Sequence, residues 1–101
     1  MDESQYRVTV ARDLEDLIPV FLQNRHKELD TLRVALAAAD FDQLRLLGHR
    51  MKGVGNSYGF DHVSTLGHYI EDGARSGDRA SLDARIREYA EYLAKVQIVY
   101  E

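Results

Sequence analysis

Two side chains spaced one helical turn apart, His49 and Lys52, are of the types that phosphoryl chemistry requires. A histidine side chain has a reference pKa of about 6.5, so an exposed histidine near pH 7 is mostly uncharged and carries a nucleophilic ring nitrogen. Such a nitrogen can attack a phosphoryl group and hold it as a phosphoramidate. A lysine on the same face can balance the charge of the phosphoryl oxygens. The pair therefore predicts a site that could carry a phosphoryl group.

A helix over residues 41–58 would turn His49 away from the protein core. At 100° per residue, the apolar side chains of this stretch fall within a sector about 80° wide. These side chains are Leu44, Leu47, Met51, Val54 and Tyr58. His49 projects nearly opposite that sector, with Lys52 one turn further on. The spacing predicts that His49 faces water or a partner.

Glycines inside this helix need a reason, because each costs roughly 0.5–1 kcal/mol relative to alanine. Gly48 and Gly55 border the core face, so they predict a close approach of neighbouring helices. Gly53 lies on the other side, next to His49, where its missing side chain would let a partner come near. Further candidates for partner contact on this helix are Arg45, Leu46 and Asn56. For Arg45, an ordinary solvated helix face is an equally good interpretation.

Composition favours one ordinary globular domain. The chain has 101 residues, of which 45% are hydrophobic and 30% charged, and its formal net charge is -4. Because there is no basic stripe, nucleic-acid binding is not expected. The absence of cysteine excludes disulfides and thiolate sites. With no signal pattern and no long apolar run, we expect a cytoplasmic chain that does not enter a membrane.

The apolar periodicity predicts an all-α fold, an antiparallel up-down four-helix bundle with a short N-terminal arm or extra helical turn. We expect an arm over 1–12 and a bundle over 13–101, capped at its start by Asp13. Pro19 should divide the first helix into a short turn and a long helix that continues toward Ala39. The second helix should begin after Asp40 and end at Gly59. The third should span about 60–76, and the fourth should run unbroken from about 81 to the C-terminus.

The other histidines offer no comparable site. His62 and His68 are six residues apart, which is a poor spacing for two metal ligands on one helix, and no cysteine or carboxylate cluster accompanies them. We therefore expect no zinc site, and no special role for His26. The tyrosines at 89, 92 and 100 are interpreted as core and rim residues of the last helix. An independent hydrolase is not expected, because no nucleophile–base pair or metal set is visible.

The stretch around His49 resembles the histidine-containing phosphotransfer (HPt) domains of two-component phosphorelays. Their pattern is a small residue, the phosphorylated histidine, two variable positions, Lys-Gly, a run of small residues and a later glycine. Here these positions are Gly48, His49, Arg50-Met51, Lys52-Gly53, the run to Ser57, and Gly59. The length and helix order of the rest of the chain also match that family, and only the first dozen residues lie outside the resemblance.

The resemblance implies that His49 is the phosphoacceptor and that Lys52 offsets the phosphoryl charge. It also implies that Gly53 leaves room for a receiver domain and that Gly59 ends the helix. HPt domains often place a polar residue on the next helix close to the imidazole, and Glu71 is the candidate for this hydrogen bond. The chain would bind no cofactor of its own, because the Mg²⁺ of the reaction would be held by the receiver domain.

The function that the resemblance implies is that of a free-standing, monomeric phosphoryl carrier without its own kinase or phosphatase activity. His49 would take a phosphoryl group from a response-regulator receiver domain, or from a histidine kinase, and pass it on. The alternative is a helical adaptor that is never phosphorylated and that binds a partner protein through its small-residue face.

Overall fold

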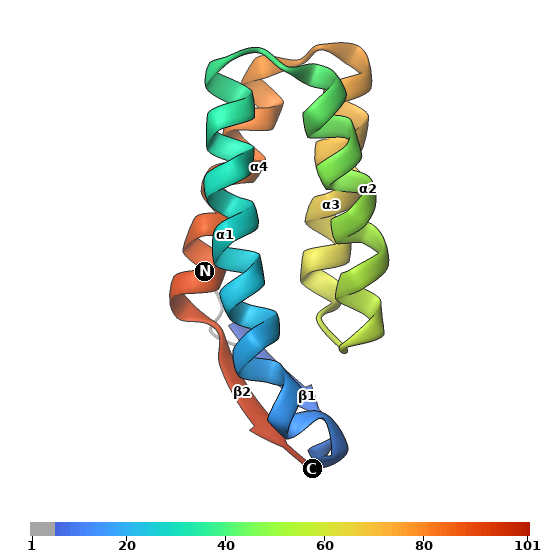
Figure 1. Ribbon diagram of the computed structural model, residues 1–101, viewed down its shortest axis with the longest axis vertical. Coiled ribbons are helices and arrows are strands. Elements are labelled where there is room, and N and C mark those ends of the chain that lie inside the picture. Colours follow the sequence, from blue (N-terminus) through green and yellow to red (C-terminus); the bar gives the residue numbers. More distant parts are fainter. Residues whose placement is uncertain (1–5) are drawn as a thin grey trace.

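Residues 6–101 are described by a computed structural model, in which four helices account for most of the chain (Figure 1). They are α1 (Ile18–Ala37), α2 (Phe41–Ser57), α3 (Asp61–Ser76) and α4 (Arg79–Lys95). Successive helices run antiparallel, with α1 beside α4 and α2 beside α3 (Figure 1). The expected all-α, up-down four-helix bundle is confirmed. None of the helices among the described residues combines the length and the hydropathy needed to cross a bilayer.

Most helix boundaries follow local signals in the sequence. The Asp40 carboxylate accepts a hydrogen bond from the backbone N–H of Gln43 at 3.1 Å, and so it caps α2 as expected. Gly59 (φ 84°) and Gly77 (φ 67°) both adopt the left-handed conformation that ends a helix and that glycine tolerates best. Pro19 lies in the first turn of α1, as predicted, where its missing N–H costs no helical hydrogen bond.

The first helical turn of the chain is not capped by Asp13 as expected. A 3₁₀ helix, η2 (Arg12–Leu17), precedes α1, in agreement with the short turn predicted before Pro19. Asp13 lies inside this turn and does not cap it. The residue that precedes η2 is Ala11, and no side chain accepts a hydrogen bond from the first turn of η2 there. The N–H of Leu14 instead bonds to the carbonyl of Ala11 at 2.9 Å, so the turn is closed by backbone alone.

A pair of short parallel strands joins the two ends of the chain. Strand β1 (Arg7–Val10) pairs with strand β2 (Gln97–Tyr100), in a register that places Arg7 beside Gln97. The pair is parallel because β1 runs opposite to α1, as α4 and its continuation β2 also do (Figure 1). The expected N-terminal arm is thus extended over residues 7–10, and residues 1–5 of that arm lie outside the described residues.

The prediction of an unbroken fourth helix to the C-terminus was wrong. Helix α4 begins at Arg79, where Asp78 caps it by accepting from the N–H of Ser81, and it ends at Lys95. Val96 has an extended backbone (φ -60°, ψ 134°), and β2 follows. The residues from Val96 to Tyr100 are rich in β-branched and aromatic types, which favour strands. Pairing with β1 therefore outweighs the helical phase of Val96 and Tyr100.

The hydrophobic core contains the side chains that the helical periodicity selected. On α2, Leu44, Leu47 and Met51 are buried. Val54 of this helix, and Tyr58 directly after it, pack against the core as half-buried side chains. Tyr89 and Tyr92 of α4 are also buried. This packing holds α2 in a fixed rotation, which decides where His49 points.

Candidate functional site

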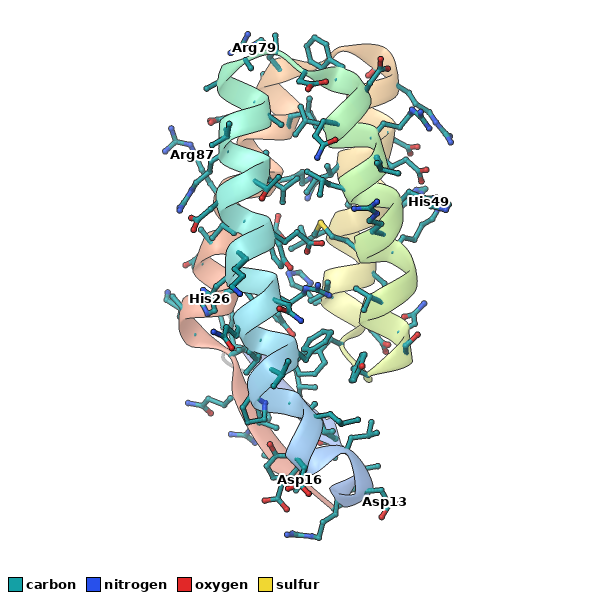
Figure 2. The ribbon with its side chains drawn as sticks, viewed as in Figure 1. Asp13, Asp16, His26, His49, Arg79 and Arg87 are labelled. Atoms are coloured by element: carbon teal, nitrogen blue, oxygen red, sulfur yellow. The ribbon has the colours of Figure 1, made fainter. Side chains whose placement is uncertain are left out.

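His49 lies on the outer surface of α2, about midway along the bundle (Figure 2). Its side chain is 65% exposed, whereas Leu47 and Met51 on the opposite side of the helix are buried. The exposure predicted from helical spacing is therefore what the structure shows. A ring this open to solvent can be reached by a partner protein.

Glycines bring α2 and α3 unusually close together beside His49. A Cβ atom added to Gly48 would lie 2.6 Å from the backbone nitrogen of Glu71 and 2.8 Å from the carbonyl oxygen of Gly67. A Cβ atom added to Gly67 would lie 2.6 Å from the backbone nitrogen of Lys52. No side chain fits at either position without moving backbone. The two glycines thus set the distance at which α3 presents Glu71 to α2.

The carboxylate of Glu71 connects the two residues that were singled out on α2. Its Oε2 lies 3.1 Å from Nδ1 of His49, and its Oε1 accepts a hydrogen bond from Nζ of Lys52 at 2.7 Å. The Glu71 side chain is only 2% exposed. The candidate partner for the imidazole is therefore in contact with it, and one buried carboxylate holds both His49 and Lys52.

These contacts keep Glu71 ionised. The hydrogen bond from Lys52 is the main cause that lowers the pKa of Glu71, and the bond to His49 lowers it further, against the opposing effect of burial. An ionised carboxylate can only accept hydrogen bonds, so Nδ1 of His49 must carry the proton and donate it. In the neutral ring, Nε2 then has the free lone pair. The geometry therefore leaves Nε2 as the ring nitrogen that is available as a nucleophile.

The comparison with protein families agrees with this arrangement. Residues 16–97 match the family model described as Hpt domain, which is most of the chain. The chain belongs to the Hpt domain family. The resemblance found in residues 48–59 is thereby confirmed. No curated protein and no solved structure matches this chain. Hpt domains carry phosphoryl groups in two-component phosphorelays and interact with histidine kinases and receiver domains.

The remaining candidates for partner contact surround His49 on the surface of this Hpt domain. A Cβ atom added to Gly53 would meet nothing within 4 Å, so that side of α2 is open. Leu46 is 40% exposed, and Arg45 and Asn56 are exposed as well. Their positions fit a docking surface around the histidine, and their roles stay predictions.

One contact of the site was missed in the sequence. Nη2 of Arg75 lies 3.3 Å from Oε2 of Glu71, so a second cation stabilises the same carboxylate. The signal was present, because Glu71 and Arg75 are four residues apart on one helix and such pairs face each other. It could be recognised only once Glu71 was known to be buried.

Two other histidines of this Hpt domain pair with carboxylates other than Glu71. His62 pairs with Glu88 at 3.2 Å, and His68 pairs with Asp72 at 3.3 Å on the surface of α3. Residues 6–101 contain no group of three histidine, aspartate or glutamate side chains placed to hold a metal ion.

Proposed function

We propose that this chain is a phosphoryl carrier in which His49 accepts a phosphoryl group from the aspartyl phosphate of a receiver domain, or from a histidine kinase, and donates it to another receiver domain. The observation that carries the proposal is the buried Glu71 carboxylate bonded to Nδ1 of His49, which leaves Nε2 as the exposed nucleophile. Membership of the Hpt domain family supports it.

The transfer step balances without a base on this chain. The Nε2 lone pair attacks phosphorus while the bond from phosphorus to the aspartate oxygen breaks, and the aspartate leaves as a carboxylate. The ring keeps its Nδ1 proton and becomes cationic, so no proton has to leave. Glu71 stabilises that developing charge, and Lys52 lies on the same face to offset the phosphoryl oxygens. The reverse sequence donates the group to the next carboxylate.

The partner supplies what this chain lacks. Positioning of the donor and the Mg²⁺ of the reaction belong to the receiver domain, so this chain acts as a substrate and carrier for catalysis by its partner. Gly53, Leu46, Asn56 and Arg45 would form the docking surface. We also propose that the chain acts in the cytoplasm. We propose that it is a monomer, because His49, Lys52 and Glu71 come from one chain and need no second copy.

The test is phosphoryl transfer from a phosphorylated receiver domain in the presence of Mg²⁺. Wild type should become labelled, and the label should be labile in acid and stable in base, as a phosphoramidate is. His49→Gln should take up no label while remaining folded. The matched control is His68→Gln, which removes a histidine of α3 that is 53% exposed, against 65% for His49, and should accept the group like wild type.

Two results would contradict the proposal. Label on His49→Gln would place the acceptor elsewhere. A folded wild-type chain that takes no label from any receiver domain or kinase in a broad panel would support the helical adaptor instead.

A further inference from the structure

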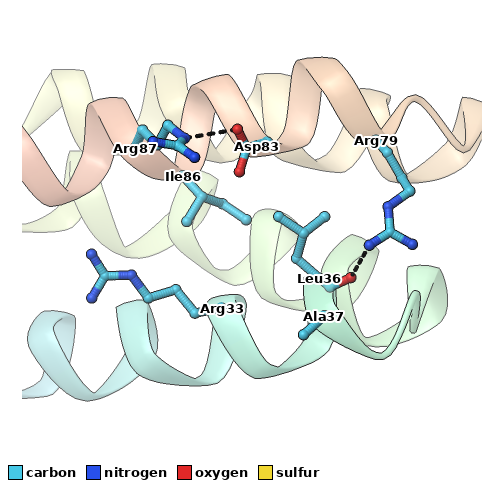
Figure 3. A pocket seen from close by; sticks show the side chains of 7 residues that line it. All are labelled: Arg33, Leu36, Ala37, Arg79, Asp83, Ile86 and Arg87. Carbon is cyan, nitrogen blue, oxygen red and sulfur yellow. Dashed lines mark hydrogen bonds and ion pairs between the residues drawn. The ribbon is translucent and has the colours of Figure 1, made fainter.

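A cavity of about 410 Å³ lies between α1 and α4, near the end of the bundle where α1 ends and α4 begins. Figure 3 shows the side chains that line it. Arg79 and Arg87 of this cavity are on the side of the bundle formed by α1 and α4, whereas His49 is on α2 (Figure 2). The cavity therefore belongs to a different surface from the phosphotransfer site.

Helical spacing brings the lining residues of each helix onto one face. On α1, the second and third lining residues follow the first by three and four positions. On α4, successive lining residues are four, three and one positions apart. The lining residues are Arg33, Leu36 and Ala37 of α1, and Arg79, Asp83, Ile86 and Arg87 of α4. The two faces oppose each other across the cavity (Figure 3).

The cavity is positively charged in a protein that is negatively charged overall. Three arginines and one aspartate line it, which gives a formal charge of +2, while the whole chain carries -4. Like charges placed around one cavity repel each other, and an anion bound between them offsets that repulsion. This local excess of cations favours a negatively charged occupant.

The guanidinium groups keep donors available for such an occupant. Arg87 contacts Asp83 through Nε at 2.7 Å, and Arg79 donates through Nη2 to the carbonyl oxygen of Leu36 at 3.2 Å. Nη1 of Arg33 is 3.9 Å from Asp30, and both of these side chains are more than half exposed, so that pair is weak. Each guanidinium has five N–H donors, of which these contacts use a minority.

Part of the surface between the arginines is apolar. Leu36 is half-buried and Ala37 is exposed, whereas Ile86 is buried, with 3% of its surface exposed. Figure 3 shows Leu36 of α1 and Ile86 of α4 pointing into the gap between the two helices. A small hydrated ion would leave this surface unused, whereas an apolar group on the ligand could cover it.

We propose that this cavity binds a small organic anion, in which a phosphate or carboxylate contacts Arg33 and Arg87 and a compact apolar group lies on Leu36 and Ala37. Arg79 holds the end of α1 through its bond to Leu36 and so keeps the cavity shaped. The site is independent of His49, and it can be occupied whether or not His49 is phosphorylated.

The test is a titration of the isotope-labelled protein followed by the NMR signals of the Leu36 and Ile86 methyl groups and of the backbone amides, those of His49 and Lys52 included. Phenyl phosphate and benzoate combine an anion with an apolar ring, and inorganic phosphate and benzyl alcohol each supply only one of the two features. At least one of the first two probes should bind about tenfold or more tightly than either of the last two. The tighter of phenyl phosphate and benzoate identifies the anionic group that the site prefers.

Matched variants separate the cavity from general electrostatics. Arg33→Gln/Arg87→Gln removes two charges from the cavity and should weaken the better probe about tenfold or more. Lys27→Gln/Lys95→Gln removes two charges from the same two helices outside it and should leave the dissociation constant within about twofold. Circular dichroism would verify that both double variants keep the wild-type helix content.

Three results would overturn the proposal. Equal weakening in the two double variants would show a general charge effect. Inorganic phosphate that binds as tightly as phenyl phosphate and benzoate would show that the apolar surface plays no part. Shifts confined to His49 and Lys52 would place the anion at the phosphotransfer site.

Discussion

Replacing Glu71 by glutamine tests the arrangement of the candidate site most sharply. Glu71→Gln keeps the size of a side chain that is 2% exposed, but removes the charge that holds Lys52 at 2.7 Å and His49 at 3.1 Å. A hydrogen bond to a charged group is worth about 1.5–3 kcal/mol. If the carboxylate stabilises by this amount the cationic ring that forms on transfer, the loss of the carboxylate charge should slow phosphoryl transfer about tenfold to a hundredfold.

The stability of the fold should change less than the transfer rate. Lys52 is 41% exposed and His49 is 65% exposed, so both can be hydrated when the carboxylate is gone. We expect Glu71→Gln to lower the free energy of unfolding by about 1–2 kcal/mol, which urea denaturation would measure. Transfer is followed by rapid quenching with a phosphorylated receiver domain. A folded Glu71→Gln that transfers at the wild-type rate would refute the role given to Glu71.

The pH dependence provides a second readout for the same residue. Because the folded state lowers the pKa of Glu71 below its ordinary value of 4.5, its ionised form stabilises the protein above that pH. This stabilisation should be lost as the pH falls below about 4.5 and through the lower folded-state pKa. The stability difference between wild type and Glu71→Gln should shrink over that range. The control is Asp72→Asn, which alters an exposed carboxylate of the same helix and should leave transfer unchanged.

Other predictions concern helix contacts and a buried hydrogen bond. Gly48→Ala should destabilise the fold by about 1–3 kcal/mol, because its Cβ would lie 2.6 Å from the backbone nitrogen of Glu71. Gly53→Ala should raise the free energy of unfolding by up to about 1 kcal/mol, because nothing lies near the added Cβ. If Gly53 leaves room for a receiver domain, the same variant should slow transfer. Tyr89→Phe should cost about 1.5–3 kcal/mol, because the Tyr89 hydroxyl donates to the buried Glu28 carboxylate at 2.9 Å.

Urea denaturation and transfer assays would check these variants together. Equal stability of Gly48→Ala and wild type would mean that the two helices can move apart without cost. A Gly53→Ala variant that is more stable and transfers at the wild-type rate would show that Gly53 is not part of the docking surface. For Tyr89→Phe the control is Tyr69→Phe, whose ring is 42% exposed and whose hydroxyl loss should change stability by less than about 0.5 kcal/mol.

The parts of the fold that depend on local spacing could be predicted from the sequence. The rotation of α2 follows from its apolar positions, and so the exposure of His49 and the nearness of Lys52 could be predicted from the sequence. The caps at Asp40, Gly59 and Gly77 depend on single residues whose chemistry is specific. Glu71 was reachable only through the family resemblance, because the distance between α2 and α3 is a property of two helices.

The parts that depend on contacts between distant residues could not be predicted in this way. Strand β1 pairs with β2 across about ninety positions of sequence, and each strand has only four residues. Neither segment would be stable as a strand by itself, so the helical phase of Val96 and Tyr100 appeared to continue α4. The cavity between α1 and α4 likewise arises from two faces that meet only in the folded bundle.

The most direct test of the central claim is to locate the phosphoryl group on the ring of His49. Nuclear magnetic resonance couplings among ³¹P, ¹⁵N and the ring protons distinguish phosphorylation at Nε2 from phosphorylation at Nδ1. Because Nδ1 donates to Glu71, the structure predicts that the phosphoryl group is bound to Nε2 of His49 and that the Nδ1 proton remains. A phosphoryl group on Nδ1, or on any other residue, would contradict this account.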